Sequence, residues 1–558
     1  MNDIRRTLIW VVFIFSLIML WDQWQVFNGK PALFFPRNNT VAEQSATGTT
    51  AGQQNTDRTV PASSGISSTG SAQTPASSAL QGERITVATD VFKLTFDTIG
   101  GRIIEADLLK FEDQTDHDLP VKLIDPAFNY QVQTGVIDAE NKQVFPRHDT
   151  PMHLMPGPLA MSDGQNTLAV RFESDEVNGI RVIRSYEFER GSYIIKVSTQ
   201  VVNSGSTTVR PELYFQLVRN SGSLPGGSMF WNTFTGPAFY NDDSRYTKVA
   251  FSDIFEGKSK ANGTAQDGWV GMVQHYFVSS WILDEGTTRE FYTQKPANQN
   301  GNYVIGMKTI MAPLAQGEQT TLTATLYVGP QDEKVLENLA PGLDLVKDYG
   351  MFRVFSKPLF WLLDMFHTFL GNWGWSIVAL VVLIKAAFFW LNAKAYQSMA
   401  KMKALTPRLQ EINERYKDNP QQKQLETMRI YREEKINPLG GCLPILIQIP
   451  VFIALYWVLL SSVEMRNAPW ILWITDLSAK DPYYILPIIM TASTLLQTWL
   501  NPTPADPMQA KMMWIMPLMF SVMFFMFPAG LVLYWVTNNL LSIAQQWFIN
   551  KRLGVHKT

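Results

Sequence analysis

The sequence predicts a protein in two parts, an α-helical membrane bundle with six transmembrane helices and a large all-β domain outside the cytoplasm. Six apolar stretches approach the roughly 20 residues that cross the hydrocarbon core of a bilayer. Between the first and second stretch, residues 83–340 form short alternating runs split by turn residues, which is typical of an antiparallel sandwich. Basic residues concentrate in one loop, and this asymmetry orients the helices.

The first apolar stretch runs from Leu8 to Leu20, after Arg5 and Arg6. No small-x-small cleavage site follows it, so we predict an uncleaved signal-anchor helix over 1–27 rather than a cleaved signal peptide. The arginines keep its N-terminus in the cytoplasm. Residues 28–82 are rich in Ser, Thr, Gly, Ala, Gln and Asn, a composition that cannot bury enough surface to offset chain entropy and that predicts a flexible tether.

Period-two runs predict the strands of the domain over 83–340, and a helical period begins only near 332–339. The chain has one cysteine, Cys442, so the domain has no internal disulfide and depends on its hydrophobic core. The clearest predicted strands are 85–87, 91–96, 168–172, 180–188, 193–202 and 320–328.

Residues 341–371 mix charged and aromatic side chains, which predicts an amphipathic helix on the membrane surface, kinked or restarted at Pro358. The bundle follows over 372–550. Its five apolar stretches are 373–391, 441–460, 483–500, 512–527 and 531–549.

Loop charge orients the bundle. Residues 392–440 carry ten lysines and arginines, whereas 461–482 carry two. The positive-inside rule therefore places both termini, this loop and the short basic tail 551–558 in the cytoplasm, with the β domain on the other side.

The basic loop itself predicts an antiparallel helical hairpin over 393–437. Apolar residues recur at spacings of three and four on both sides of a break at Lys417-Asp418-Asn419-Pro420. The positive charge suits lipid head groups or ribosomal RNA. A solvated hairpin that only obeys the positive-inside rule is the alternative.

Lys385 lies inside the second apolar stretch, where a lysine costs roughly 2.5–3.5 kcal/mol on insertion scales. It either snorkels to the cytoplasmic interface or faces a water-filled cavity. Gln448 lies at a similar depth, and Asn538, Ser542 and Gln545 share one face of the last stretch. Such dense polar groups are expensive against lipid, which favours the cavity, with interhelical hydrogen bonding as the alternative.

Seven methionines crowd residues 508–526. Flexible thioethers suit a surface that accepts varied apolar helices, although ordinary membrane packing explains any one of them equally well.

Other classes of protein are disfavoured. The net charge of −2 gives no electrostatic support to nucleic-acid binding. The six histidines form no i,i+4 metal pair, and the Walker, GxSxG and HExxH motifs do not occur. No apolar stretch holds an acidic residue suited to a proton relay. We therefore predict no catalytic residues, no metal and no cofactor, and hence no enzyme, pump or intramembrane protease.

Five motifs stand out between about 350 and 550. They are Asn437-Pro438-Leu439-Gly440-Gly441-Cys442-Leu443-Pro444 continuing to Gln448-Ile449-Pro450, Asp476-Leu477-Ser478, Asp481-Pro482-Tyr483-Tyr484-Ile485-Leu486-Pro487, Asp506-Pro507-Met508-Gln509, and Phe527-Pro528-Ala529-Gly530-Leu531-Val532-Leu533-Tyr534-Trp535. Together these motifs resemble the YidC/Oxa/Alb family of membrane protein insertases. The outer domain, the tether and the extra first helix resemble its Gram-negative form.

This resemblance implies a bacterial inner-membrane protein with a five-helix core, a hydrophilic groove open to cytoplasm and lipid, and a periplasmic β-supersandwich related to sugar-binding folds. It also implies insertion and folding of nascent membrane proteins, alone or with the Sec translocon (SecYEG and SecDF). The other implied partners are membrane lipids and, through the hairpin and tail, the ribosome and signal-recognition machinery.

The expected site has two parts. The client-binding groove comprises Lys385, Gln448, Tyr534, Asn538, Ser542 and Gln545, and the apolar slide comprises Met516, Met519, Met523, Ile449 and Phe452.

The chain departs from the family at two positions. Familiar members usually carry arginine where this chain has Lys385, and some carry threonine at Val381, so that threonine contact is not carried over.

Two other functions stay open. A small-solute transporter could use the same cavity, and would be favoured by inverted repeats and facing broken helices, neither of which the sequence shows. An envelope sugar-binding receptor anchored by the helices is the other.

Overall fold

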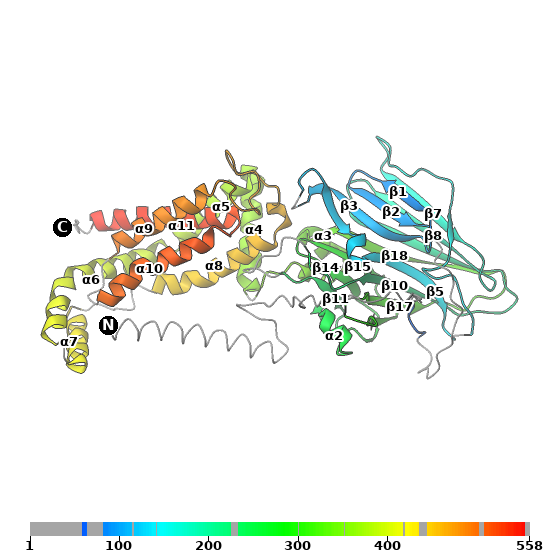
Figure 1. Cartoon of the computed structure of the whole chain (residues 1–558), viewed down its shortest axis with the longest axis horizontal. Helices are drawn as coiled ribbons and strands as arrows, with labels where there is room; N and C mark the ends of the chain where they lie inside the picture. Colours follow the sequence, from blue (N-terminus) through cyan, green and yellow to red (C-terminus); the bar gives the residue numbers. More distant parts are fainter. Residues whose placement is uncertain are drawn as a thin grey trace, which may run out of the picture. The chain divides into compact units, whose positions relative to one another are not determined.

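The computed structural model describes residues 59–63, 82–113, 116–140, 142–224, 233–299, 301–350, 352–416, 419–434, 443–501 and 507–552. These residues fall into two compact units, one ending at Lys347 and one beginning at Asp348 (Figure 1). The predicted signal-anchor over 1–27 lies outside the described residues, as do most of the predicted tether and residues 553–558 of the tail.

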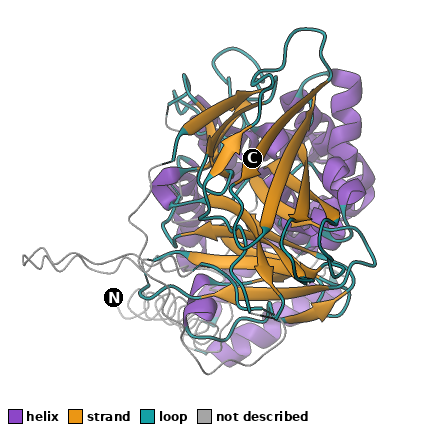
Figure 2. Ribbon diagram, turned by 90° about the vertical axis from the view of Figure 1, so that its right-hand side faces the viewer, coloured by secondary structure: helices purple, strands orange, loops and turns teal. Residues whose placement is uncertain are grey.

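The first unit contains two antiparallel sheets of nine strands each (Figure 2). The first sheet has the order β1-β2-β3-β5-β10-β17-β16-β13, with β4 paired to β3, and the second has the order β12-β11-β14-β15-β18-β9-β8-β7-β6. In the first sheet the strands are β1 (Arg84–Ala88), β2 (Phe92–Asp97), β3 (Arg102–Glu112), β4 (Pro120–Ile124), β5 (Gln131–Asp138), β10 (Pro211–Arg219), β13 (Gly263–Ala265), β16 (Arg289–Gln294) and β17 (Tyr303–Ile310). In the second they are β6 (Met152–Leu154), β7 (Thr167–Ser174), β8 (Ile180–Glu189), β9 (Ile194–Asn203), β11 (Gly236–Tyr240), β12 (Thr247–Lys248), β14 (Trp269–Val273), β15 (Phe277–Ile282) and β18 (Gln319–Pro330).

The inner faces of the two sheets form the core of this unit. Burial alternates along β8, as expected of a strand with one face inward. Every residue of the central strand β10 is buried. Aromatic rings join the layers, with Phe215 of β10 and Trp281 of β15 at 5.0 Å between centroids. The prediction of an antiparallel β domain is confirmed, and all six of the clearest predicted strands form at their expected places.

Short helices complete the unit. They are η1 (Pro126–Phe128), α2 (Phe251–Phe255), α3 (Glu333–Leu339) and η2 (Leu343–Val346). Asp332 caps α3 by accepting hydrogen bonds from the backbone of Lys334 and Val335, so the helical period near 332–339 is also confirmed.

The second unit is helical. Its last helix is its centre, because α11 packs against α5, α6, α8 and α9, while α4 packs on α5 and α8, and α10 on α9. The helices are α4 (Arg353–Leu370), α5 (Trp373–Ala387), α6 (Phe389–Arg415), α7 (Pro420–Glu433), α8 (Leu443–Ser461), η4 (Val463–Met465), α9 (Ile485–Leu500), α10 (Pro507–Phe524) and α11 (Ala529–Arg552).

Two predicted helices differ from the structure in extent. The amphipathic helix expected over 341–371 begins only at Arg353, because Gly342 and Gly350 adopt left-handed φ values of 69° and 64° that interrupt a right-handed helix. Pro358 lies inside α4 and does not restart it. The stretch expected over 373–391 is divided at Phe388, where α5 ends and α6 begins.

No single helix among the described residues is both long enough and apolar enough to cross a membrane. The required length and apolar composition are reached only by two helical segments taken together, Trp373–Ala387 of α5 and Phe389–Ser398 of α6. These two segments are bent by 64° relative to each other. The six predicted transmembrane helices are therefore not confirmed.

Candidate functional site

Lys385 on α5 meets Ser542 on α11. The ammonium Nζ donates to Ser542 Oγ at 2.8 Å, and the same hydroxyl donates to the main-chain carbonyl of Asn538 at 2.7 Å. The serine proton is therefore committed to its own helix, which leaves an oxygen lone pair to accept from the lysine. Within the described residues, Lys385 makes no ion pair with a carboxylate.

A second polar contact lies one helical turn away on α11. Gln448 Nε2 of α8 donates to Asn538 Oδ1 at 2.6 Å. Tyr534 lies one further turn toward the N-terminus of α11. Positions 534, 538 and 542 recur every four residues and thus share one face. This face contacts both α5 and α8, so the groove residues Lys385 and Gln448 reach the same strip of α11.

Helix α6 contacts the C-terminal part of this strip of α11. The Tyr396 hydroxyl donates to the Ser542 carbonyl at 3.5 Å, and Gln545 Nε2 donates to the Phe389 carbonyl at 3.4 Å. The other amide atom of Gln545, Oε1, is buried and has no hydrogen-bond partner among the residues that the structure describes. Phe389 is the first residue after the bend at Phe388, so Gln545 contacts the backbone where the helix is broken.

Aromatic rings lie beside the polar strip. Tyr534 is buried and stacks on Phe452 of α8 at 5.9 Å between ring centroids. Phe452 also meets Trp535 edge-to-face at 4.6 Å, and Trp535 contacts Phe524 of α10 at 5.1 Å. Phe452 is therefore held between α8 and α11 rather than pointing freely outward.

The other residues of the predicted apolar slide are more exposed. Met516, Met519 and Ile449 are 49%, 69% and 44% exposed, and Met523 is half-buried. The methionines are on α10, which packs on α9, whereas Ile449 is on α8, which packs on α4. The structure thus places the five slide residues on two helices, and Trp535 of α11 bridges between them.

Two polar residues of α11 belong to a different contact. Asn539 Nδ2 donates to Thr494 Oγ1 at 2.9 Å and to Ser493 Oγ at 3.2 Å, both on α9. Gln546, seven residues later, donates to Asn501 Oδ1 at 3.3 Å. Both faces of α11 therefore form interhelical hydrogen bonds, which the sequence left open as an alternative to a cavity. In the sequence the two faces differ by a single position, because Asn538 belongs to the first face and Asn539 to the second.

Helices α6 and α7 pack through Leu405 and Leu409, with Ile430 and Tyr431 against them. Arg408 forms an ion pair with Glu434 at 3.0 Å, and Arg429 pairs with Glu433 at 2.9 Å. Part of the positive charge that suits RNA or lipid is thus paired within the hairpin.

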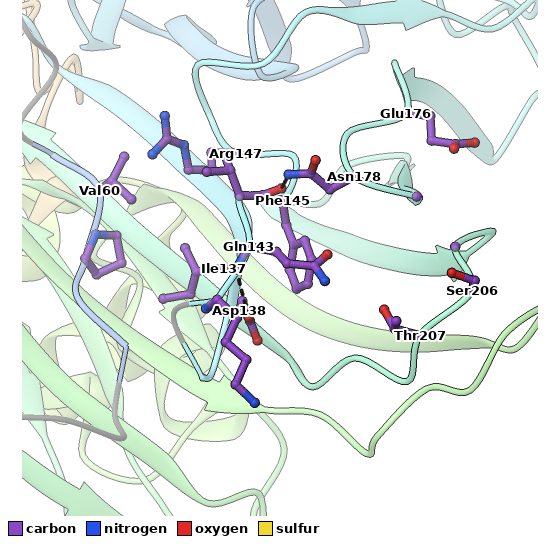
Figure 3. A pocket seen from close by; sticks show the side chains of 15 residues that line it. Val60, Ile137, Asp138, Gln143, Phe145, Arg147, Glu176, Asn178, Ser206 and Thr207 are labelled. Carbon is purple, nitrogen blue, oxygen red and sulfur yellow. Dashed lines mark hydrogen bonds between the residues drawn. The ribbon is translucent and has the colours of Figure 1, made fainter. Parts of the chain in front are cut away.

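A polar cleft of 870 Å³ opens in the β unit (Figure 3). Asp138, Arg147, Asn178 and Thr207 are among its lining residues, and Val60 lies at its edge. Asp138 accepts backbone hydrogen bonds within its own loop, and Arg147 pairs with Asp149 at 2.8 Å. No cluster of three metal-ligating side chains exists among the described residues.

Comparison with known proteins gives full-length matches. One family model, described as the 60Kd inner membrane protein, matches residues 365–556, and a second, the YidC periplasmic domain, matches 84–362. The membrane protein insertase YidC of Cupriavidus taiwanensis is 48% identical over 100% of this chain and 99% of its own. The protein of the same name from Burkholderia multivorans is 48% identical over 99% of both chains.

Two solved structures match this chain over different shares of its length. A crystal structure of an active YidC insertase with the first transmembrane domain resolved matches 85% of this chain and 93% of its own, with a TM-score of 0.38 at 17% identity. A galactose mutarotase related enzyme from Lactobacillus acidophilus matches 44% of this chain and 97% of its own, with a TM-score of 0.30 at 10% identity.

Proposed function

This chain belongs to the YidC family of membrane protein insertases, and from that premise we propose how its helical unit inserts client helices. The family is non-enzymatic, acts on nascent membrane proteins at the inner membrane and carries a periplasmic domain. The proposed groove is the polar strip of α11 with the facing side chains of α5 and α8, open to cytoplasm and lipid. Its residues are Lys385, Gln448, Tyr534, Asn538, Ser542 and Gln545.

One observation supports this groove above the others. Lys385 donates to a neutral hydroxyl, and no carboxylate among the described residues neutralises it. An unneutralised ammonium attracts anions, and it does so more strongly in a site of low dielectric than in bulk water. A client whose short outer segment carries Asp or Glu would be drawn toward Ser542 and Asn538. The hydroxyl and amides there would replace part of the water that the segment loses.

Movement of the client's apolar helix into lipid supplies the driving force. Burial of apolar surface is worth roughly 25 cal/mol per Å². The proposed exit passes the exposed methionines of α10 and Ile449 of α8, whose side chains adapt to different client surfaces. The groove lowers the free energy needed to desolvate the client's polar segment. Burial of the client's apolar helix in lipid provides the favourable free energy.

The proposed topology has six transmembrane helices, the first over 1–27 and five in the core, with both termini in the cytoplasm. Helix α4 would lie along the membrane surface, since Val354, Trp361 and Phe369 are 81%, 63% and 79% exposed. The Sec translocon would cooperate with the core. The ribosome and signal-recognition machinery would meet the α6–α7 hairpin and the basic tail.

Reversal of the groove charge tests the mechanism. In vesicles reconstituted with the full chain, Lys385→Glu is expected to lower insertion of clients with acidic outer tails at least about tenfold, since even partial like-charge repulsion exceeds 1.4 kcal/mol at this depth. Lys385→Arg is the matched control and should retain insertion. Clients with neutral tails should be affected less. Equal insertion by Lys385→Glu and the unaltered protein would defeat the charge mechanism.

A solute transporter remains a second candidate because of one observation, the 64° break between α5 and α6 beside Gln545. Broken helices line substrate sites in many transporters, usually as a facing pair. Flux of small solutes into vesicles that contain only this protein would support that function, and the absence of such flux would exclude it.

A further inference from the structure

The outer face of the first sheet is polar at its centre. There β10 carries Glu212, Tyr214 and Gln216, β16 carries Tyr292 and Gln294, and β17 carries Lys308. Most of these side chains are buried. Two glycines make room for the rings. Gly135 lies beside Tyr214 and Gly306 beside Tyr292, and a Cβ at either position would come within 2.4–2.5 Å of the phenol oxygen. The face is therefore shaped around flat side chains rather than packed with aliphatic ones.

A short segment of the predicted tether lies on this face. Gln216 Nε2 donates to the carbonyl of Thr59 at 3.1 Å, and Gln294 Nε2 donates to the carbonyl of Val60 at 3.2 Å. Lys308 Nζ donates to the carbonyl of Ala62. Residues Thr59–Ser63, which fall within the predicted tether, thus contact the β unit instead of hanging free.

The segment is bound through its main chain. These three contacts all use its carbonyl oxygens, and Pro61 between them has no N–H to donate. Pro61 and Ser63 are buried while Ala62 is exposed, which is the alternation of an extended chain. The Thr59 side chain also makes a contact, between Thr59 Oγ1 and His148 Nε2 at 2.9 Å.

Neighbouring side chains hold the donors in position. The Tyr292 hydroxyl donates to Gln216 Oε1 at 2.7 Å, so the amide nitrogen of Gln216 is turned toward the segment. That nitrogen also donates to Gln133 Oε1 at 2.6 Å. Lys308 lies between two carboxylates, with Glu290 at 3.4 Å and Glu212 at 4.0 Å. Such fixed donors reduce the entropy lost on binding.

We propose that this face is a binding site for an extended, proline-containing peptide segment that it recognises by its main-chain carbonyls, and that Thr59–Ser63 is its resident occupant. Recognition through carbonyls requires little of the side chains, as in other extended-peptide sites. The 870 Å³ cleft continues the site, because Val60 and Pro61 form part of its wall (Figure 3). Docking leaves only residues 28–58 of the predicted tether between the predicted signal-anchor and the docked segment.

Competition for the site tests the proposal in the full-length protein. A fluorescent peptide of residues 58–64 is titrated against the unaltered chain and against a chain with residues 59–63 replaced by glycine and serine. The peptide should bind the replaced chain, and the unaltered chain at least about tenfold more weakly because its site is already occupied. No binding to the replaced chain, or equal binding to both, would overturn the proposal.

A matched pair of substitutions locates the site. Gln294→Ala in the replaced chain should weaken peptide binding about fivefold, as loss of one hydrogen bond predicts. Gln200→Ala, on β9 of the other sheet, is the control and should have no effect. Lys308 is left intact because its removal would leave Glu212 buried without its cation. Equal affinity of the two variants contradicts the site.

Crosslinking gives an independent measurement without segment replacement. A benzophenone side chain at position 60 of the otherwise unaltered chain should crosslink to β16 near Gln294. Absence of any crosslink from position 60 to the β unit would also overturn the proposal.

Discussion

Lys385 Nζ on α5 and Ser542 Oγ on α11 are 2.8 Å apart, and this hydrogen bond joins residues 157 positions apart in the chain. The serine uses its proton for the Asn538 carbonyl and its lone pair for the lysine. A cation is therefore held by a neutral partner. The arrangement keeps the ammonium in place, and no carboxylate among the described residues pairs with it.

A carboxylate at position 542 should cancel that charge. Ser542→Asp places an anion beside Lys385, and we expect insertion of acidic-tailed clients to fall about as far as in Lys385→Glu. Ser542→Asn has nearly the same size without the charge and should retain most insertion. Vesicle insertion assays with tails of different charge provide the measurement. Similar losses for Asp and Asn would indicate a packing effect and contradict the electrostatic account.

The Gln448–Asn538 contact should couple the two side chains energetically. Gln448→Leu alone leaves the Asn538 amide without this partner and is expected to lower stability by about 1–3 kcal/mol. The double variant with Asn538→Leu should recover part of that loss, because both polar groups are then removed. Its client insertion should nevertheless stay reduced, since the strip has lost its polarity. Thermal unfolding in detergent and insertion assays separate these effects, and additive stability losses would refute the coupling.

Asn539 should behave differently from its neighbour. It is buried and donates to Ser493 and Thr494 of α9, away from the proposed groove. Asn539→Leu is expected to reduce the stability of the α9–α11 contact by about 1–3 kcal/mol, because its two hydrogen bonds to the Ser493 and Thr494 hydroxyls are lost. Insertion per folded molecule should change little. A loss of insertion with unaltered stability would place Asn539 in the groove instead.

Strand positions could be predicted from the sequence because a period of two reports directly which residues face the core, as β8 illustrates. The order of strands in the sheets could not, because it depends on pairings such as β9 with β18 that join distant segments. The break at Phe388 could not be predicted either, because neither proline nor glycine lies there. The structure offers no physical account of this break.

The candidate site was partly predictable for a similar reason. The helical spacing of Asn538, Ser542 and Gln545 predicts a shared face, and an apolar environment makes Lys385 conspicuous. Which partner each residue meets depends on how separate helices pack. The docked residues Thr59–Ser63 were missed because the composition of the surrounding segment predicts no core, whereas docking here uses backbone carbonyls, which composition does not report.

Buried tyrosines should make the β unit sensitive to alkaline pH. Burial raises the pKa of Tyr130, Tyr214 and Tyr292 above the ordinary value of 10.0. The folded state therefore keeps protons that the unfolded state loses, so this stability is complete below pH 10 and declines as the pH rises above it. Each such tyrosine contributes about 1.4 kcal/mol per pH unit in that window. Denaturation of the full chain can be followed by the far-ultraviolet circular dichroism of its β signal. Above about pH 10, the free energy of unfolding should fall more steeply with pH in the unaltered protein than in Tyr292→Phe. Equal pH dependence of the two proteins would mean that Tyr292 ionises as readily in the folded unit as in the unfolded chain.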